Sequence, residues 1–192
     1  MTSSEAVSKD PTRMTVDEYL TRTPGTARPA ELIYGELRVA ESPSARHQAA
    51  VADLFRALDH HARERGLGEV RAAPIDVVLD GDHALVLQPD LVFISNARAS
   101  ILQERVNGAP DLMVDVLSPE PRIGRTEERV QWCAESGVRE CWFVHQDLRS
   151  IAIFRFAYRR IAARVVHGRQ DPIASAVLPD LGACLDDILL AE

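Results

Sequence analysis

Lysine is almost missing from this chain: the only one among its 192 residues is Lys9. Arginine supplies every other fixed positive charge, so a mechanism that needs a lysine in a folded active site is in difficulty. Cysteine is also scarce, with three residues and no Cys-x-x-Cys pair. This odd number argues against a disulfide framework and a zinc ribbon. We expect the three cysteines to be small buried core residues.

Long apolar runs are missing too, since none approaches the roughly 18–20 residues that span a bilayer. The first ten residues lack the apolar centre of a secretory signal, so we expect a cytoplasmic protein without membrane association. The length and the hydrophobic content of 46% fit one domain with a substantial core. A formal net charge of −7 counts against a dedicated nucleic-acid binder, although carboxylates that hold a cation add to this negative total.

The residue pattern predicts an α/β (α+β) fold. A helix from Ala45 to Arg65 is indicated by apolar residues three and four positions apart. We expect a hairpin at residues 31–40, further strands at 69–79, 85–94, 112–117, 140–145 and 151–156, and helices at 15–22, 98–104 and 126–136. This order predicts a mixed β-sheet flanked by helices, in a single domain of residues 13–192 that follows a disordered tail, 1–12.

Two acidic residues stand out because each lies at an apolar strand. Asp115 lies within Leu112–Leu117, a run that is apolar on both sides, as in a buried central strand. A buried carboxylate is costly unless it is paired, neutralised or bound to a cation. Asp90 follows Pro89, and a proline can interrupt a strand ladder and re-aim the next residue. The two acids can converge on one Mg²⁺, which prefers a few carboxylates, or each can pair with an arginine.

Two weaker candidates accompany this pair. Glu36 begins the second strand of the expected hairpin and is a third potential metal ligand, although alone it would be an ordinary surface glutamate. His47 lies near the start of the long helix and can approach the same site. A helix-cap or packing role for His47 is the alternative.

Several segments together resemble the Uma-type restriction endonuclease family, in sequence and in order: ELIYGEL, SPSARHQ, PIDVVLD, QPDLVFI, GAPDLMVDVLSPE and RECWFV. The resemblance runs from about Met14 to Phe156. It implies the fold of the PD-(D/E)xK nucleases, a mixed sheet between helices, and Mg²⁺- or Mn²⁺-dependent cleavage of DNA. It also favours a homodimer, since cutting both strands suits two-fold symmetry.

The resemblance also assigns site residues, and this chain departs from the family at two of them. The family's acids match Glu36, Asp90 and Asp115, and its catalytic lysine, on the helix that follows the sheet, matches Arg129. Asp115 stands where the family usually has glutamate, which keeps the charge and shortens the reach by one methylene. Arg129 supplies charge and hydrogen bonds, but its planar fork differs from a compact ammonium group.

Three hypotheses follow for the function. The leading one is a metal-dependent DNA endonuclease in which Asp90 and Asp115 hold Mg²⁺ or Mn²⁺, Glu36 assists and Arg129 stabilises the phosphate oxygens. The second is a catalytically weakened protein of the nuclease fold that binds rather than cuts, as Arg129 and the acidic net charge suggest. The third is a structural domain whose acids only pair with arginines.

Overall fold

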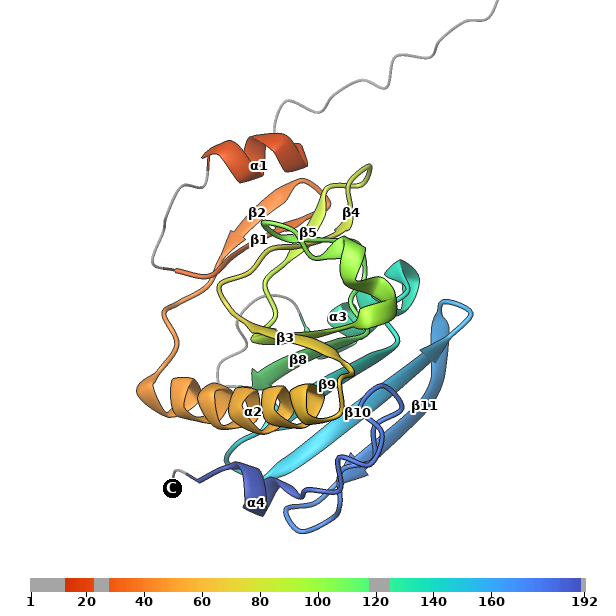
Figure 1. Ribbon diagram of the computed structural model, residues 1–192. Coiled ribbons are helices and arrows are strands. Elements are labelled where there is room, and N and C mark those ends of the chain that lie inside the picture. The colour runs from red at the N-terminus through yellow and green to blue at the C-terminus, as the bar shows by residue number, and fades with distance from the viewer. Residues whose placement is uncertain (1–12, 23–27, 118–124, 191–192) are drawn as a thin grey trace, which may run out of the picture.

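The strands of this protein form two sheets (Figure 1), and the computed structural model describes residues 13–22, 28–117 and 125–190. The expected tail of residues 1–12 lies outside the described residues. Sheet A has the order β2-β1-β5-β4-β7 and sheet B the order β11-β10-β9-β8-β6-β3. Both sheets are mixed, because β4 pairs with β7 and β8 with β9 in parallel, whereas the other pairs are antiparallel.

The strands of sheet A are β1 (Ala30–Ile33), β2 (Glu36–Val39), β4 (Val77–Asp80), β5 (Leu85–Leu87) and β7 (Val106–Asn107). Those of sheet B are β3 (Gly68–Ala72), β6 (Leu91–Ser95), β8 (Leu112–Leu117), β9 (Glu140–His145), β10 (Ser150–Ala157) and β11 (Arg160–His167). The helices are α1 (Val16–Arg22), α2 (Ala45–Glu64), α3 (Thr126–Ser136) and α4 (Leu185–Ile188), with a 3₁₀ helix, η1 (Asn96–Ile101).

The long helix, the hairpin, strands β8 and β9 and helix α3 are confirmed, but two predicted strands were wrong. The expected strand 69–79 is split between β3 in sheet B and β4 in sheet A, and the strand 85–94 between β5 in sheet A and β6 in sheet B. Pro74 and Pro89 lie at these breaks. A proline donates no hydrogen bond to a ladder, and each of these two expected strands crosses from one sheet to the other at its proline. The single expected sheet is therefore two.

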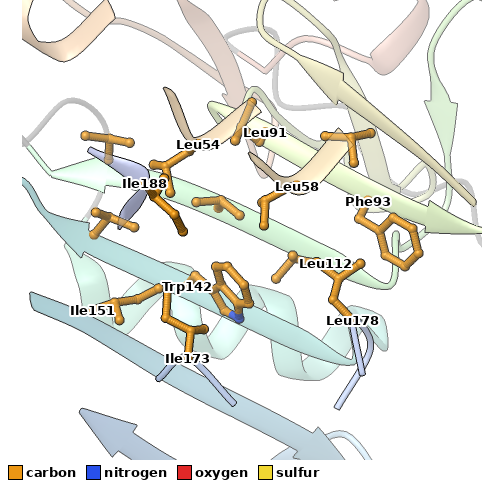
Figure 2. Packing of buried hydrophobic residues seen from close by; sticks show 14 of the residues in the cluster. Leu54, Leu58, Leu91, Phe93, Leu112, Trp142, Ile151, Ile173, Leu178 and Ile188 are labelled. Carbon is orange, nitrogen blue, oxygen red and sulfur yellow. The ribbon is translucent and has the colours of Figure 1, made fainter. Parts of the chain in front are cut away.

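Helix α2 packs on one face of sheet B, where the largest core cluster lies (Figure 2). Its fully buried Leu54 and Leu58 join Leu112 and Trp142 from the sheet. Segments near the C-terminus close the same core, which includes Ile173, Leu178 and Ile188. Burying such side chains stabilises the fold by roughly 1.5–3 kcal/mol each.

The opposite face of sheet B forms a second core with sheet A and α3. The side chains of β8 alternate between the two cores: Val114 and Val116 face α2, whereas Met113 lies in the second core. Because strand side chains alternate between faces, Asp115 points toward sheet A and α3. Helix α1 covers the outer side of sheet A through Tyr19, which packs with Leu32. The site is thus built between the two sheets.

Two further expectations can be compared with the structure. Cys133 and Cys141 are buried as expected, whereas Cys184 is only partly buried, so the prediction was wrong for that residue. In the part of the chain that the structure describes, no helix has the length and apolar character to cross a membrane.

Candidate active site between the two sheets

Arg129 lies at the centre of a buried ionic cluster. Its Nε and Nη2 atoms donate to the two carboxylate oxygens of Asp115 at 3.0 and 2.9 Å, and its Nη1 atom donates to both oxygens of Glu31 at 3.0 and 2.8 Å. The three side chains are at most 10% exposed. Since Glu31 belongs to sheet A and Asp115 to sheet B, the guanidinium of α3 joins the two sheets.

Asp90 lies at the start of β6, in the sheet that also holds Asp115. Its Oδ2 atom accepts a hydrogen bond from the Val116 backbone N–H at 2.8 Å, next to Asp115 in the chain. Its Oδ1 atom lies 3.1 Å from Nε2 of His47, whose side chain is completely buried. The structure thus brings Asp90, Asp115 and Arg129 together as expected, and places His47 against the acid.

The start of α2 explains how His47 reaches Asp90. Ser44 is the N-cap of the helix, and its hydroxyl accepts a hydrogen bond from the His47 backbone N–H at 3.2 Å. A capped first turn fixes the direction in which the third helical residue leaves the backbone. The His47 side chain therefore lies against Asp90 while its backbone N–H belongs to the cap, so the two alternative interpretations of His47 are compatible.

Glu31, which the sequence analysis did not single out, is held by a second set of contacts. The Gln88 backbone N–H donates to its Oε1 atom at 2.8 Å, and the Gln88 side chain donates to Asp76 and accepts from the Ala30 backbone N–H. These bonds fix β1 to the segment just before Asp90. The sequence feature that could have indicated the burial of Glu31 is its position beside the apolar Leu32 and Ile33, which resembles the surroundings of Asp115.

Glu36 is not brought into this cluster. It lies on the edge strand β2, its side chain is 68% exposed, and it pairs with Arg38 at 3.3 Å. In the β1–β2 register Glu36 faces Ile33, while Arg38 faces Glu31. Glu36 therefore lies on the rim of the sheet, and Glu31 is the acid of this hairpin that lies in the buried cluster.

Burial and charge act against each other in the cluster. Burial raises the pKa of Asp115, the guanidinium of Arg129 opposes this rise, and the neighbouring carboxylates of Asp90 and Glu31 add to it. Burial alone would lower the pKa of Arg129, but Asp115 and Glu31 outweigh it and hold that pKa well above its usual range. Arg129 is thus a permanent cation, whereas Asp115 holds a proton more readily than an exposed aspartate.

The chemistry of these donors suits a hard divalent cation, although their present contacts do not form a cation site. Three buried carboxylates and one guanidinium leave a formal charge of −2 when all are ionised, and Mg²⁺ prefers carboxylate oxygens. Among the residues that the structure describes, however, no three acidic, histidine or cysteine side chains stand ready to ligate one ion. Arg129 occupies the space between Glu31 and Asp115. The types of side chain fit a divalent cation, but Arg129 would have to move away from these acids before the ion could bind.

The comparisons with known proteins agree with this architecture. The family model of Uma2, described as "Putative restriction endonuclease", matches residues 16–186. The chain belongs to the Uma2 family. A solved structure described as a "putative nuclease belonging to DUF820" from Anabaena variabilis shares the fold, with a TM-score of 0.77 and 16% sequence identity over 92% of this chain and 97% of that one. No curated protein is similar enough to count as a match.

The family is described as one of putative restriction endonucleases, so membership relates this protein to that type. The matched range includes every residue of the ionic cluster, from Glu31 in the first sheet to Arg129 on α3. The cluster therefore lies within the part of the chain that matches the family model.

Proposed function

We propose that this Uma2 protein is a metal-dependent DNA endonuclease whose site consists of Glu31, Asp90 and Asp115. The observation that carries the proposal is the convergence of three buried acids from two sheets: Glu31 and Asp115 share Arg129, and Asp90 lies close enough to Asp115 to raise its pKa. Burying three carboxylates is costly without matching positive charge, and one guanidinium balances only part of their charge. A divalent cation would balance the remainder.

Each residue has a distinct part in this proposal. Asp90 and Asp115 would hold Mg²⁺ or Mn²⁺, and Glu31 would assist from the opposite sheet. When bound, the ion lowers the pKa of a water molecule and shields the charge of the phosphate. His47 and the Val116 backbone N–H orient the Asp90 carboxylate. Arg129 brings a fixed positive charge next to the phosphate, where it would stabilise negative charge that develops on the oxygens.

Cleavage of supercoiled plasmid in Mg²⁺ or Mn²⁺ tests this function. We expect the wild type to nick the plasmid and Asp90→Asn to lose nearly all cleavage, because the amide removes the charge while keeping the shape. Glu31→Gln should lose cleavage, whereas Glu36→Gln, on the exposed rim, should keep it. Undiminished cleavage by Asp90→Asn would refute the proposal. Loss of cleavage in Glu36→Gln alone would return the role of third acid to that residue. A two-fold dimer would allow both strands to be cut.

A second function is favoured by one specific contact. Three nitrogen atoms of Arg129 donate to Glu31 and Asp115, so its guanidinium is held against these two acids. A lysine ammonium group would be freer to turn toward a water molecule or a phosphate. The protein would then be a nuclease-fold binding protein with little activity. The two functions differ in the same assay: a silent wild type with cleavage restored in Arg129→Lys indicates the binding protein, and cleavage by the wild type indicates the enzyme.

A further inference from the structure

The contacts of Arg129 suggest how cation binding at this site is controlled. Its guanidinium meets Asp115 through two parallel N–H···O bonds, 3.0 and 2.9 Å long, that use both carboxylate oxygens. Such fork-to-fork pairs are the strongest and most directional contacts between ionised side chains. Asp115 therefore has little freedom to turn one oxygen toward another cation while both are held.

The same guanidinium restrains a second acid of the site. Its third nitrogen, Nη1, donates to both oxygens of Glu31. Two of the three acids proposed as metal ligands are therefore bonded to one internal cation that is at most 10% exposed. A divalent ion placed against Asp115 would lie close to this positive charge, and in a buried site the repulsion between the two is weakly screened.

We propose that Arg129 is the resident cation of the cluster and that a divalent metal ion binds only by displacing it from Asp115. This inference rests on the proposed function, because it concerns the same acids, and it adds that the arginine lowers metal affinity. A lysine at this position would hold the charge on a single flexible ammonium group. Lysine cannot reproduce the two-bond contact with Asp115 while it also reaches Glu31, so it would leave Asp115 freer to bind metal.

Mn²⁺ binding without DNA tests the inference independently of cleavage. We expect Arg129→Lys to bind Mn²⁺ about tenfold more tightly than the wild type in calorimetric titration, since the lost bond to a charged group is worth about that factor. Mn²⁺ should also raise its melting temperature more. Arg139→Lys is the matched control. Arg139 is also paired with a buried acid, Asp111, at 3.0 Å, and its replacement should leave Mn²⁺ binding unchanged.

A second measurement uses the unaltered protein, so that the test does not depend on a variant that folds. In nitrogen-15 NMR spectra, the buried Nε–H of Arg129 should give a resolved signal that shifts as Mg²⁺ saturates the protein. An Arg129→Lys variant that binds Mn²⁺ no better than the wild type would overturn the inference. So would an Nε–H signal that stays in place at saturating Mg²⁺. Either result would leave the proposed cleavage reaction to be judged by the plasmid assay alone. Conversely, if Arg129→Lys binds Mn²⁺ more tightly but does not cleave plasmid, the inference is supported and the proposed endonuclease function is refuted.

Discussion

Replacing Arg129 by methionine should reveal how much the fold depends on the ionic cluster. Methionine has a similar volume but no charge, so Glu31 and Asp115 would stay buried without their common partner. Removing one member of a buried ion pair typically costs about 3–5 kcal/mol. In a chain of this length each kcal/mol lowers the melting temperature by about 2–4 °C. We therefore expect Arg129→Met to melt about 6–20 °C below the wild type at neutral pH.

The loss should also depend on pH, in a direction set by Asp115. The pKa of this carboxyl is already raised by burial, against the opposing charge of Arg129, and it should rise further when the arginine is removed. A group whose pKa is raised in the folded state favours folding at low pH, and this contribution is lost as the pH rises through the folded pKa. The difference between Arg129→Met and the wild type should therefore be smaller at pH 5 than at pH 8.

Thermal unfolding followed by circular dichroism at both pH values, with a chelator present, measures these effects. The double variant Arg129→Met/Asp115→Asn should regain part of the lost stability, because the amide removes one of the uncompensated charges. Arg38→Met is the matched control, since Arg38 pairs with the exposed Glu36 and exposed pairs contribute little. A melting temperature of Arg129→Met close to the wild type, or a deficit equal at pH 5 and pH 8, would contradict the reasoning.

Three further predictions concern other parts of the fold. Burial opposes ionisation of Asp111, but its hydrogen bonds and the arginines near it, including Arg139, lower its pKa. The contribution of ionised Asp111 to folding stability should be present at neutral pH and lost as the pH falls below the ordinary pKa of an aspartate. Asp111→Asn should thus be less stable than the wild type in urea at pH 7, with a smaller difference at pH 3. Leu58→Ala, in the core beneath α2, should cost about 2–5 kcal/mol in urea unfolding; a cost under 1 kcal/mol would mean that the core collapses around the gap. Ser44→Ala should cost about 1 kcal/mol through loss of the N-cap and lower plasmid nicking by loosening His47; unchanged nicking would limit the cap to stability.

Much of the fold could be predicted from local patterns, and what could not be predicted depends on long-range packing. Helix α2 has a clear helical periodicity and strand β8 is a short apolar run with defined ends, so their limits were nearly exact. The division into two sheets was missed because the segments 69–79 and 85–94 were each predicted as one continuous strand, although a proline lies inside each of them. Only the pairing partners show that the chain leaves one sheet at Pro74 and Pro89 and continues in the other.

The site followed the same rule. The burial of Asp90 and Asp115 could be predicted because both lie in apolar surroundings, and Arg129 was a candidate because its segment resembles the family's lysine segment. Glu31 and Glu36 are only five residues apart in one hairpin, and the choice between them depends on which strand is at the edge of sheet A. Sheet order is a property of the whole chain, so this choice could not be made locally. The partners of Arg129 could not be predicted from the sequence for the same reason.

The bonds of Arg129 to both sheets have an evolutionary consequence. A lineage that no longer needs to cut DNA still needs its two sheets to stay together, so selection for folding alone would conserve Glu31 and Asp115. An exchange of lysine for arginine would be favoured under that selection, since it gives the acids a partner with more bonds. Buried acids at positions 31 and 115 can therefore be kept for the structural task of holding the two sheets together, and their presence alone does not indicate catalysis.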